Sequence, residues 1–228
     1  MGTIRFLATL VLGGVLNLCH AAGLSDLTNK EAASGLKEAL VQGADYAVST
    51  LGKENGFLGN PQARIPLPES LKTAEKTLRA VGMGKYADEL VATMNHAAER
   101  AVVEAKPVLM DSVSRMTLQD AKGILTGGDN SVTEFFRRST SEQLVQKFMP
   151  IVSESTKKVN LADRYNKFAG RAAKMGLLSE QDADLDTYIT HKAMDGLFAM
   201  IAEKEKEIRH NPMAAGSDLL KKVFGAIR

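Results

Sequence analysis

Three histidines, His96, His191 and His210, are the residues best suited by type to metal binding or acid–base chemistry. Helical bundles that hold two metal ions carry two Glu-x-x-His pairs and two further glutamates. Only one such pair occurs here, formed by Glu207 and His210 in a charged stretch. Polar neighbours lie one helical turn from His96 and His191, as is common at protein surfaces. The sequence therefore predicts no metal site and no cofactor.

Patterns for nucleophilic catalysis and phosphate binding are absent or incomplete. The chain has no Gly-x-Ser-x-Gly sequence and no predicted strand to carry one. The sequence LTGGDN at 125–130 leads into a predicted helix start, where free N–H groups can hold an anion. It lacks the Gly-Lys-Ser/Thr of a P-loop. We interpret it as a turn between two capped helices and keep Asp129 as a binding candidate.

Arginine side chains at two places in the sequence could have a structural role, or they could clamp an anion or a carboxylate group. Arg137 and Arg138 are expected to close a helix, where the dipole favours cations by about 0.3–1 kcal/mol. Arg64 lies in an apolar, proline-locked segment, so its charge needs a partner. We expect a buried salt bridge from Arg64 to Asp111, Asp120 or Asp129. The candidate binding residues are Asn60, Arg64, Asp129, Arg137 and Arg138.

A catalytic alternative would use carboxylate and arginine side chains together. Asp120, Asp129, Arg64 and Arg137 would then have to converge on one cleft. Nothing in their spacing favours this arrangement, so we assign no catalytic residues.

The elements that must position these residues are all helical, because no run alternates apolar and polar residues in the manner of a strand. Thr117 is predicted to cap one helix, and Ser131 with Glu134 to form a capping box on the next. The predicted helices cover 28–51, 69–81, 85–105, 107–116, 117–126, 131–138, 140–152, 161–175, 184–210 and 217–224. Glu205 and Arg209 have i,i+4 spacing on a face that we expect to be solvated.

The segment 53–68 interrupts this pattern with three prolines but keeps several apolar residues. We predict that it is a packed strap laid across helix ends, beneath which a ligand could enter. No internal repeat or low-complexity linker divides the chain. The predicted fold is therefore a single compact all-α multi-helix bundle over residues 22–228.

Composition argues against two classes of protein, the non-specific nucleic-acid binders and the disulfide-stabilised domains. With 228 residues and a formal net charge of +2, the chain lacks the basic excess of a non-specific nucleic-acid binder. A single cysteine excludes an intramolecular disulfide framework.

Residues 1–21 have the pattern of a secretory signal peptide, with one basic residue, an apolar run and small residues near the end. The run is too short for a transmembrane helix, and no later stretch approaches that length. We expect export and cleavage after Ala21. Lipidation at Cys19 is a minor alternative, because Leu18 is not the small residue that this processing requires.

Four phrases carry a family resemblance: GFLGNPQARIPLP (56–68), DAKGILTGGDNSVTEFFRR (120–138), LDTYITHKAMDGLFAMIAEKEKEIR (185–209) and SDLLKKVFG (217–225). Together they resemble the bacterial exported proteins grouped as domain of unknown function 4197. The resemblance implies a signal peptide, an all-helical fold and a periplasmic location in Gram-negative bacteria. It implies no activity and no functional residues.

Three functions are therefore kept as hypotheses. The first is a non-catalytic periplasmic module that binds a small molecule or a protein. The second is an envelope-associated structural factor that acts through helix–helix contacts. The third, a hydrolase-type enzyme using Asp and Arg groups, has the least support.

Overall fold

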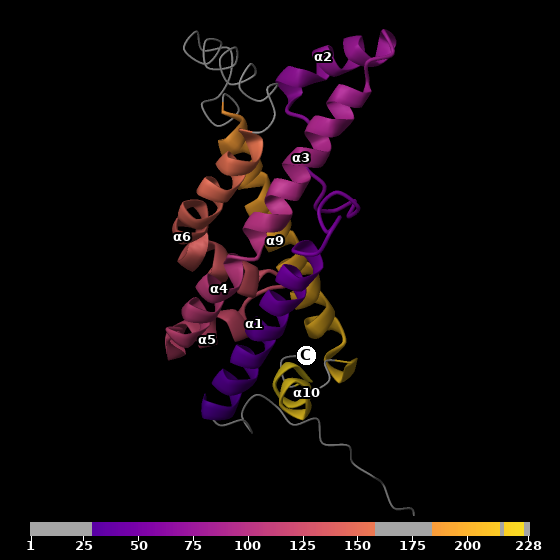
Figure 1. The fold of residues 1–228 in the computed structure, drawn as a ribbon. Coiled ribbons are helices and arrows are strands. Elements are labelled where there is room, and N and C mark those ends of the chain that lie inside the picture. Colours follow the sequence, from indigo (N-terminus) through magenta and orange to yellow (C-terminus); the bar gives the residue numbers. More distant parts are fainter. Residues whose placement is uncertain (1–28, 158–183, 215–216, 226–228) are drawn as a thin grey trace, which may run out of the picture.

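The computed structural model describes residues 29–157, 184–214 and 217–225, and the part of the chain so described is helical without any strand (Figure 1). The all-α prediction is confirmed. The helices are α1 (Asn29–Leu51), α2 (Glu69–Ala80), α3 (Lys85–Val102), α4 (Ala105–Ser114), α5 (Leu118–Thr126), α6 (Ser131–Thr156), α9 (Leu185–His210) and α10 (Asp218–Gly225), with a 3₁₀ turn, η2 (Pro212–Ala214), before α10. The predicted signal peptide, Cys19 and the predicted helix at 161–175 lie outside the described residues.

The helix α9 lies at the centre of the bundle and contacts α1, α3 and α6. Its middle is apolar on most sides, and Leu197, Phe198 and Ile201 are fully buried there. One hydrophobic cluster connects these side chains with buried residues of α1, α3, α4, α5, α6 and α10. Burial of this cluster is what holds the helices together. No helix within the described ranges is long and apolar enough to cross a membrane.

The helix α6 is continuous from Ser131 to Thr156, which corrects the prediction that Arg137 and Arg138 end one helix and Thr140 begins another. The Thr140 hydroxyl donates to the Phe136 carbonyl, at 2.6 Å, instead of capping a new helix. Thr140 is also buried, at 1% exposure. Inside a helix, the hydroxyl of Ser or Thr can donate to the carbonyl one turn earlier. Thr140 therefore did not mark a helix start, although its residue type is common at helix caps.

The segment 52–68 folds as a series of turns whose apolar side chains pack inward. Phe57, Ile65 and Leu67 are buried. A Cβ placed on Gly196 of α9 would lie 2.7 Å from Cε1 of Phe57, so the Phe57 ring sits directly on the backbone of α9. Packing of Phe57 at this point requires the glycine.

Two side chains of α3 hold this segment by its backbone. Oε1 of the buried Glu99 accepts from the N–H groups of Phe57 and Leu58, at 3.0 and 3.1 Å. The amide of the fully buried Asn95 bonds to both backbone polar groups of Ile65. An irregular segment has no ladder or helix to satisfy its backbone, and these side chains supply the missing partners.

Candidate functional site

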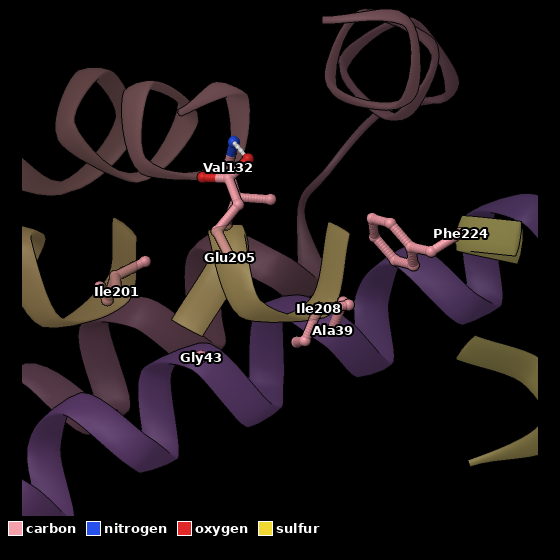
Figure 2. Close-up of a pocket in the computed structure, with 7 residues that line it drawn as sticks. All are labelled: Ala39, Gly43, Val132, Ile201, Glu205, Ile208 and Phe224. Atoms are coloured by element: carbon pink, nitrogen blue, oxygen red, sulfur yellow. Dashed lines mark hydrogen bonds between the residues drawn. The ribbon is translucent and has the colours of Figure 1, made fainter. Parts of the chain in front are cut away.

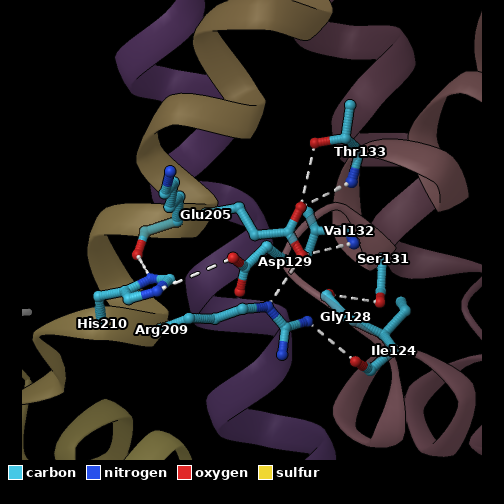
Figure 3. A network of polar contacts seen from close by, with 10 residues as sticks. Ile124, Gly128, Asp129, Ser131, Val132, Thr133, Glu205, Arg209 and His210 are labelled. Atoms are coloured by element: carbon cyan, nitrogen blue, oxygen red, sulfur yellow. Dashed lines mark hydrogen bonds and ion pairs between the residues drawn. The ribbon is translucent and has the colours of Figure 1, made fainter.

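The buried carboxylate of Glu205 on α9 caps the start of α6 (Figure 3). Oε1 accepts from the N–H of Val132 at 2.9 Å, and Oε2 accepts from the N–H and hydroxyl of Thr133 at 3.0 Å each. These N–H groups are among those that a helix start leaves without partners. The expected Ser131–Glu134 capping box is wrong, because the Ser131 hydroxyl donates to the Gly128 carbonyl instead.

Arg209 completes this cluster from one turn further along α9. Its Nε donates to Oε1 of Glu205 at 3.0 Å, and Nη2 donates to the Ile124 carbonyl at the end of α5 at 2.9 Å. The i,i+4 pair predicted from the sequence is therefore present. The expectation that it is solvated is wrong, since the side chains of Glu205 and Arg209 are only 2% and 10% exposed. The pair ties α9 to both helices that flank the 127–130 turn.

Burial raises the pKa of Glu205 above its ordinary value. The hydrogen bonds from Val132 and Thr133 and the charge of Arg209 act in the opposite direction. Desolvation is the larger effect because ionising a carboxylate away from water is costly.

Two hollows flank the Glu205–Arg209 cluster. The first is small and mostly apolar, with about 10 Å³ of space, which is room for at most about one water molecule (Figure 2). Its lining residues are Ala39, Gly43, Val132, Ile201, Glu205, Ile208 and Phe224. It is too small for an organic ligand, so it is a packing defect at the junction of α1, α6, α9 and α10.

The second hollow is an open cleft of about 340 Å³ at the 127–130 turn, which we call the turn cleft. Its lining residues are Leu125, Thr126, Gly127, Asp129, Arg209, His210 and Phe224. The C-terminal ends of α5 and α9 both meet here. Helix C-termini carry a partial negative charge, and the side chain of Asp129 is 52% exposed beside them.

Three polar side chains in the turn cleft differ in how many of their hydrogen-bonding positions are already occupied. Arg209 is neutralised by Glu205, and its guanidinium carbon lies 5.6 Å from the centre of the Phe224 ring. Nδ1 of His210 donates to the Lys206 carbonyl at 2.9 Å, which leaves Nε2 facing Asp129 at 3.8 Å. The Asp129 carboxylate therefore has the most open bonding capacity in the cleft.

The other predicted binding residues lie elsewhere, and the set does not form one site. Arg137 stacks over the Phe198 ring at 4.6 Å and lies 3.6 Å from Asp195 on α9. Arg138 faces α5, with Nη2 4.0 Å from Asp120. Neighbouring residues on a helix point about 100° apart, which explains why the two arginines contact different helices.

Asn60 and Arg64 belong to the 52–68 segment, and neither lines the turn cleft. Oδ1 of Asn60 accepts from the Gln62 N–H at 3.0 Å, and Nδ2 lies 3.5 Å from Sδ of Met200. The expected buried salt bridge of Arg64 is wrong, because Arg64 is exposed and pairs with none of the three proposed aspartates. These aspartates face other partners: Asp111 faces Arg115, Asp120 faces Arg138 and Asp129 faces His210.

The convergence required by the catalytic alternative is not observed. Asp120 borders a cleft of about 500 Å³ with Arg138, whereas Asp129 borders the turn cleft. Arg64 acts near α3, where it adds weakly to the effect of Arg79 in lowering the pKa of Asp88. The four suspected residues thus face different parts of the molecule.

The polar neighbours of His96 were expected to be typical surface residues, but Glu99 on α3 is buried and pairs with His96. Nδ1 of the half-exposed His96 lies 2.8 Å from Oε2 of Glu99, the carboxylate that also holds Phe57 and Leu58. The pair opens on a cleft of about 420 Å³ that is also lined by Lys53 and Arg100. The i,i+3 spacing was visible in the sequence, but burial of Glu99 depends on the 52–68 segment folding over it. In the described chain, no group of three or more His, Cys, Asp or Glu is placed to hold a metal ion.

The fold and these clefts define an all-helical protein in which buried polar side chains serve mainly to clamp irregular segments. Residues 26–225 match the family described as protein of unknown function (DUF4197), and the chain belongs to this family. The resemblance noted in the sequence is thereby confirmed. No curated protein matches the chain, and no solved structure matches it.

Proposed function

We propose that this protein is an exported, non-catalytic binding protein of the periplasm, and that its ligand carries a positively charged nitrogen group. The observation that supports the proposal is the turn cleft, where the exposed Asp129 carboxylate lies beside the C-terminal ends of α5 and α9. All three features favour a cation. The signal-peptide pattern of residues 1–21 supports export.

The geometry of the cleft favours binding over catalysis. Arg209, the buried charged group in its lining, is committed to Glu205 and to the carbonyl of Ile124. The groups that remain accessible in the turn cleft are the carboxylate of Asp129 and the imidazole of His210, which suit recognition of an ammonium or guanidinium group.

Binding is tested by NMR titration of the processed protein with putrescine, and with succinate as the anionic probe. We expect putrescine to shift the amide signals of Gly127 and Gly128 and succinate to leave them unchanged. Asp129→Asn should weaken putrescine binding about tenfold, as expected for loss of one charged hydrogen bond. The matched control is Asp218→Asn, which removes another exposed carboxylate outside the cleft.

Two outcomes would contradict the proposed binding site. One is putrescine binding that Asp129→Asn and Asp218→Asn weaken equally, because the interaction would then be a general surface effect. The other is a response of Gly127 and Gly128 to succinate alone. Export is tested separately by fractionation and N-terminal sequencing. Ala22 as the first residue supports cleavage after Ala21, whereas a lipid-modified Cys19 supports the anchored alternative.

A further inference from the structure

The helix α2 and the first turns of α3 form a hairpin that projects from the bundle, at the end of the molecule opposite α5 and α10 (Figure 1). The two helices pack on each other. Residues 76–86, which we call the hairpin tip, form the apex of this projection. The tip is thus separate from the turn cleft, and a role for the tip does not depend on the proposed function.

The turn at the apex is closed by a well-defined helix C-cap. The N–H of Met83 donates to the Leu78 carbonyl at 2.8 Å, and the N–H of Gly82 donates to the Arg79 carbonyl at 3.1 Å. Gly82 has a φ of 75°, in the left-handed region that this motif requires. The cap reverses the chain sharply and gives the side chains on either side of Gly82 fixed positions.

Those side chains are apolar and exposed. Val81, Met83 and Tyr86 are 63%, 43% and 43% exposed, within a span of six residues. The other large apolar side chains with comparable exposure in the described chain are Val103, Leu118 and Met213, which lie apart on other elements. A local concentration of exposed apolar groups marks a surface that contacts something other than water.

The charge of the hairpin tip has a single sign. Residues 76–86 contain Lys76, Arg79 and Lys85, and the acidic residues of the hairpin lie outside this stretch. Arg79 is paired with Glu75 and Asp88, just outside the tip. Lys76 and Lys85 are exposed and lack an ion pair within the described residues, and Nζ of Lys85 lies 5.1 Å from the centre of the Tyr86 ring. Two lysines therefore remain available to an anionic partner.

We propose that the hairpin tip docks on an anionic phospholipid surface. Val81 and Met83 would enter the interfacial region, and Tyr86 would lie at the level of the headgroups, where aromatic residues are favoured. Lys76 and Lys85 would bind lipid phosphates, as basic residues do beside anionic leaflets. A convex apex with three apolar side chains offers far less than the roughly 1,000 Å² that a specific protein interface needs, whereas a bilayer requires no matching concave surface.

The test is co-sedimentation of the processed protein with vesicles. One set mixes phosphatidylglycerol with phosphatidylcholine, and the other contains phosphatidylcholine alone. We expect weak, reversible binding to the anionic vesicles that high salt weakens. Lys76→Gln with Lys85→Gln should reduce this binding about tenfold, and Val81→Ser with Met83→Ser should abolish it. The matched control is Leu118→Ser with Met213→Ser, which removes two apolar groups elsewhere that are more exposed than those of the tip, and it should leave binding unchanged.

Three results would overturn the proposal. The first is failure of the wild-type protein to bind either type of vesicle. The second is equal loss of binding in the tip and control variants. The third is a concentration-dependent dimer in solution that Met83→Ser abolishes, because the tip would then bind a second copy. All substituted residues are exposed, and circular dichroism melting checks that each variant remains folded.

Discussion

The side-chain amide of Asn95 pairs with both backbone groups of Ile65: Oδ1 accepts the N–H at 2.8 Å and Nδ2 donates to the carbonyl at 2.9 Å. Nδ2 also donates to the Val91 carbonyl at 2.8 Å. A residue of α3 thus supplies the partners that a neighbouring strand would give. Because Asn95 is fully buried, water does not compete for these bonds.

Replacing Asn95 by Ala should therefore destabilise the protein by about 2–4 kcal/mol, since two backbone groups of Ile65 lose their partners in a dry site. Chemical denaturation of both proteins measures the difference. The control is Asn130→Ala, because Asn130 is exposed and makes no side-chain capping bond. A loss below about 1 kcal/mol for Asn95→Ala would mean that water or a local shift replaces the lost bonds.

Gly196→Ala should destabilise the protein by about 1–3 kcal/mol, because the added methyl group would lie 2.7 Å from the Phe57 ring. Gly43→Ala in α1 is the matched control, since its nearest neighbouring atom would be 3.9 Å away. In a helix interior that substitution should be neutral or stabilising, by up to about 1 kcal/mol. Adding Phe57→Leu to Gly196→Ala should recover part of the loss. If it does not, glycine is required at position 196 for a reason other than the close approach of the Phe57 ring.

The pH dependence of stability should reveal the buried Glu205. The pKa of Glu205 is raised in the folded state, so the folded protein binds the proton more tightly than the unfolded chain does. Its contribution is fully present below the ordinary pKa of 4.5 and is lost as the pH rises through the higher folded-state pKa. Glu205→Gln cannot ionise, so its stability relative to the wild type should improve from acid to neutral pH.

Denaturation midpoints of both proteins across this pH range provide the measurement. Comparing the two proteins matters because other carboxylates act in the opposite sense. Hydrogen bonds from Thr117 lower the pKa of Asp120, so its contribution is present above its ordinary pKa and is lost as the pH falls. That contribution is common to both proteins and cancels. A difference that is constant with pH would show that the pKa of Glu205 is not raised.

The sequence predicted the helices wherever a strong stop coincided with the end of an apolar pattern. Thr117 caps α5, as expected, and the structure adds a capping box with Asp120. Pro212 follows the end of α9, as expected. The errors at the start and in the middle of α6 both came from residue type. Ser131 and Thr140 have the residue types of helix caps, but the cap of α6 comes from Glu205, 73 positions beyond Val132. Local sequence does not encode a capping group that arrives through tertiary contact.

Of the charged residues in the candidate site, only the exposed Asp129 was predicted from the sequence to belong to a binding site. Asp129 was recognised because it follows the Gly-Gly turn, whereas the cleft around it depends on where α9 ends and α10 packs. Glu205 and Arg209 had a visible i,i+4 spacing, yet a charged stretch is usually solvated. Their burial could not be inferred without knowing that α5 and α6 both meet α9 there. Arg64 shows the opposite error. Its apolar sequence neighbours led us to expect a buried side chain, but the side chain is exposed.

The ion pair of Glu205 and Arg209 provides the last prediction. Arg209→Met would leave the Glu205 carboxylate buried without its cation, and loss of one partner from a buried pair costs about 3–5 kcal/mol. Glu205→Gln with Arg209→Met should recover part of this loss, because Gln carries no charge and its single oxygen still accepts from the N–H of Val132 or of Thr133, although not from both. Recovery would remain incomplete, since the Ile124 carbonyl loses its donor in both variants. Urea denaturation of the four proteins gives the coupling free energy. If the double variant is no more stable than Arg209→Met, the role of Arg209 is its bond to Ile124 and its packing on Phe224, not neutralisation of Glu205.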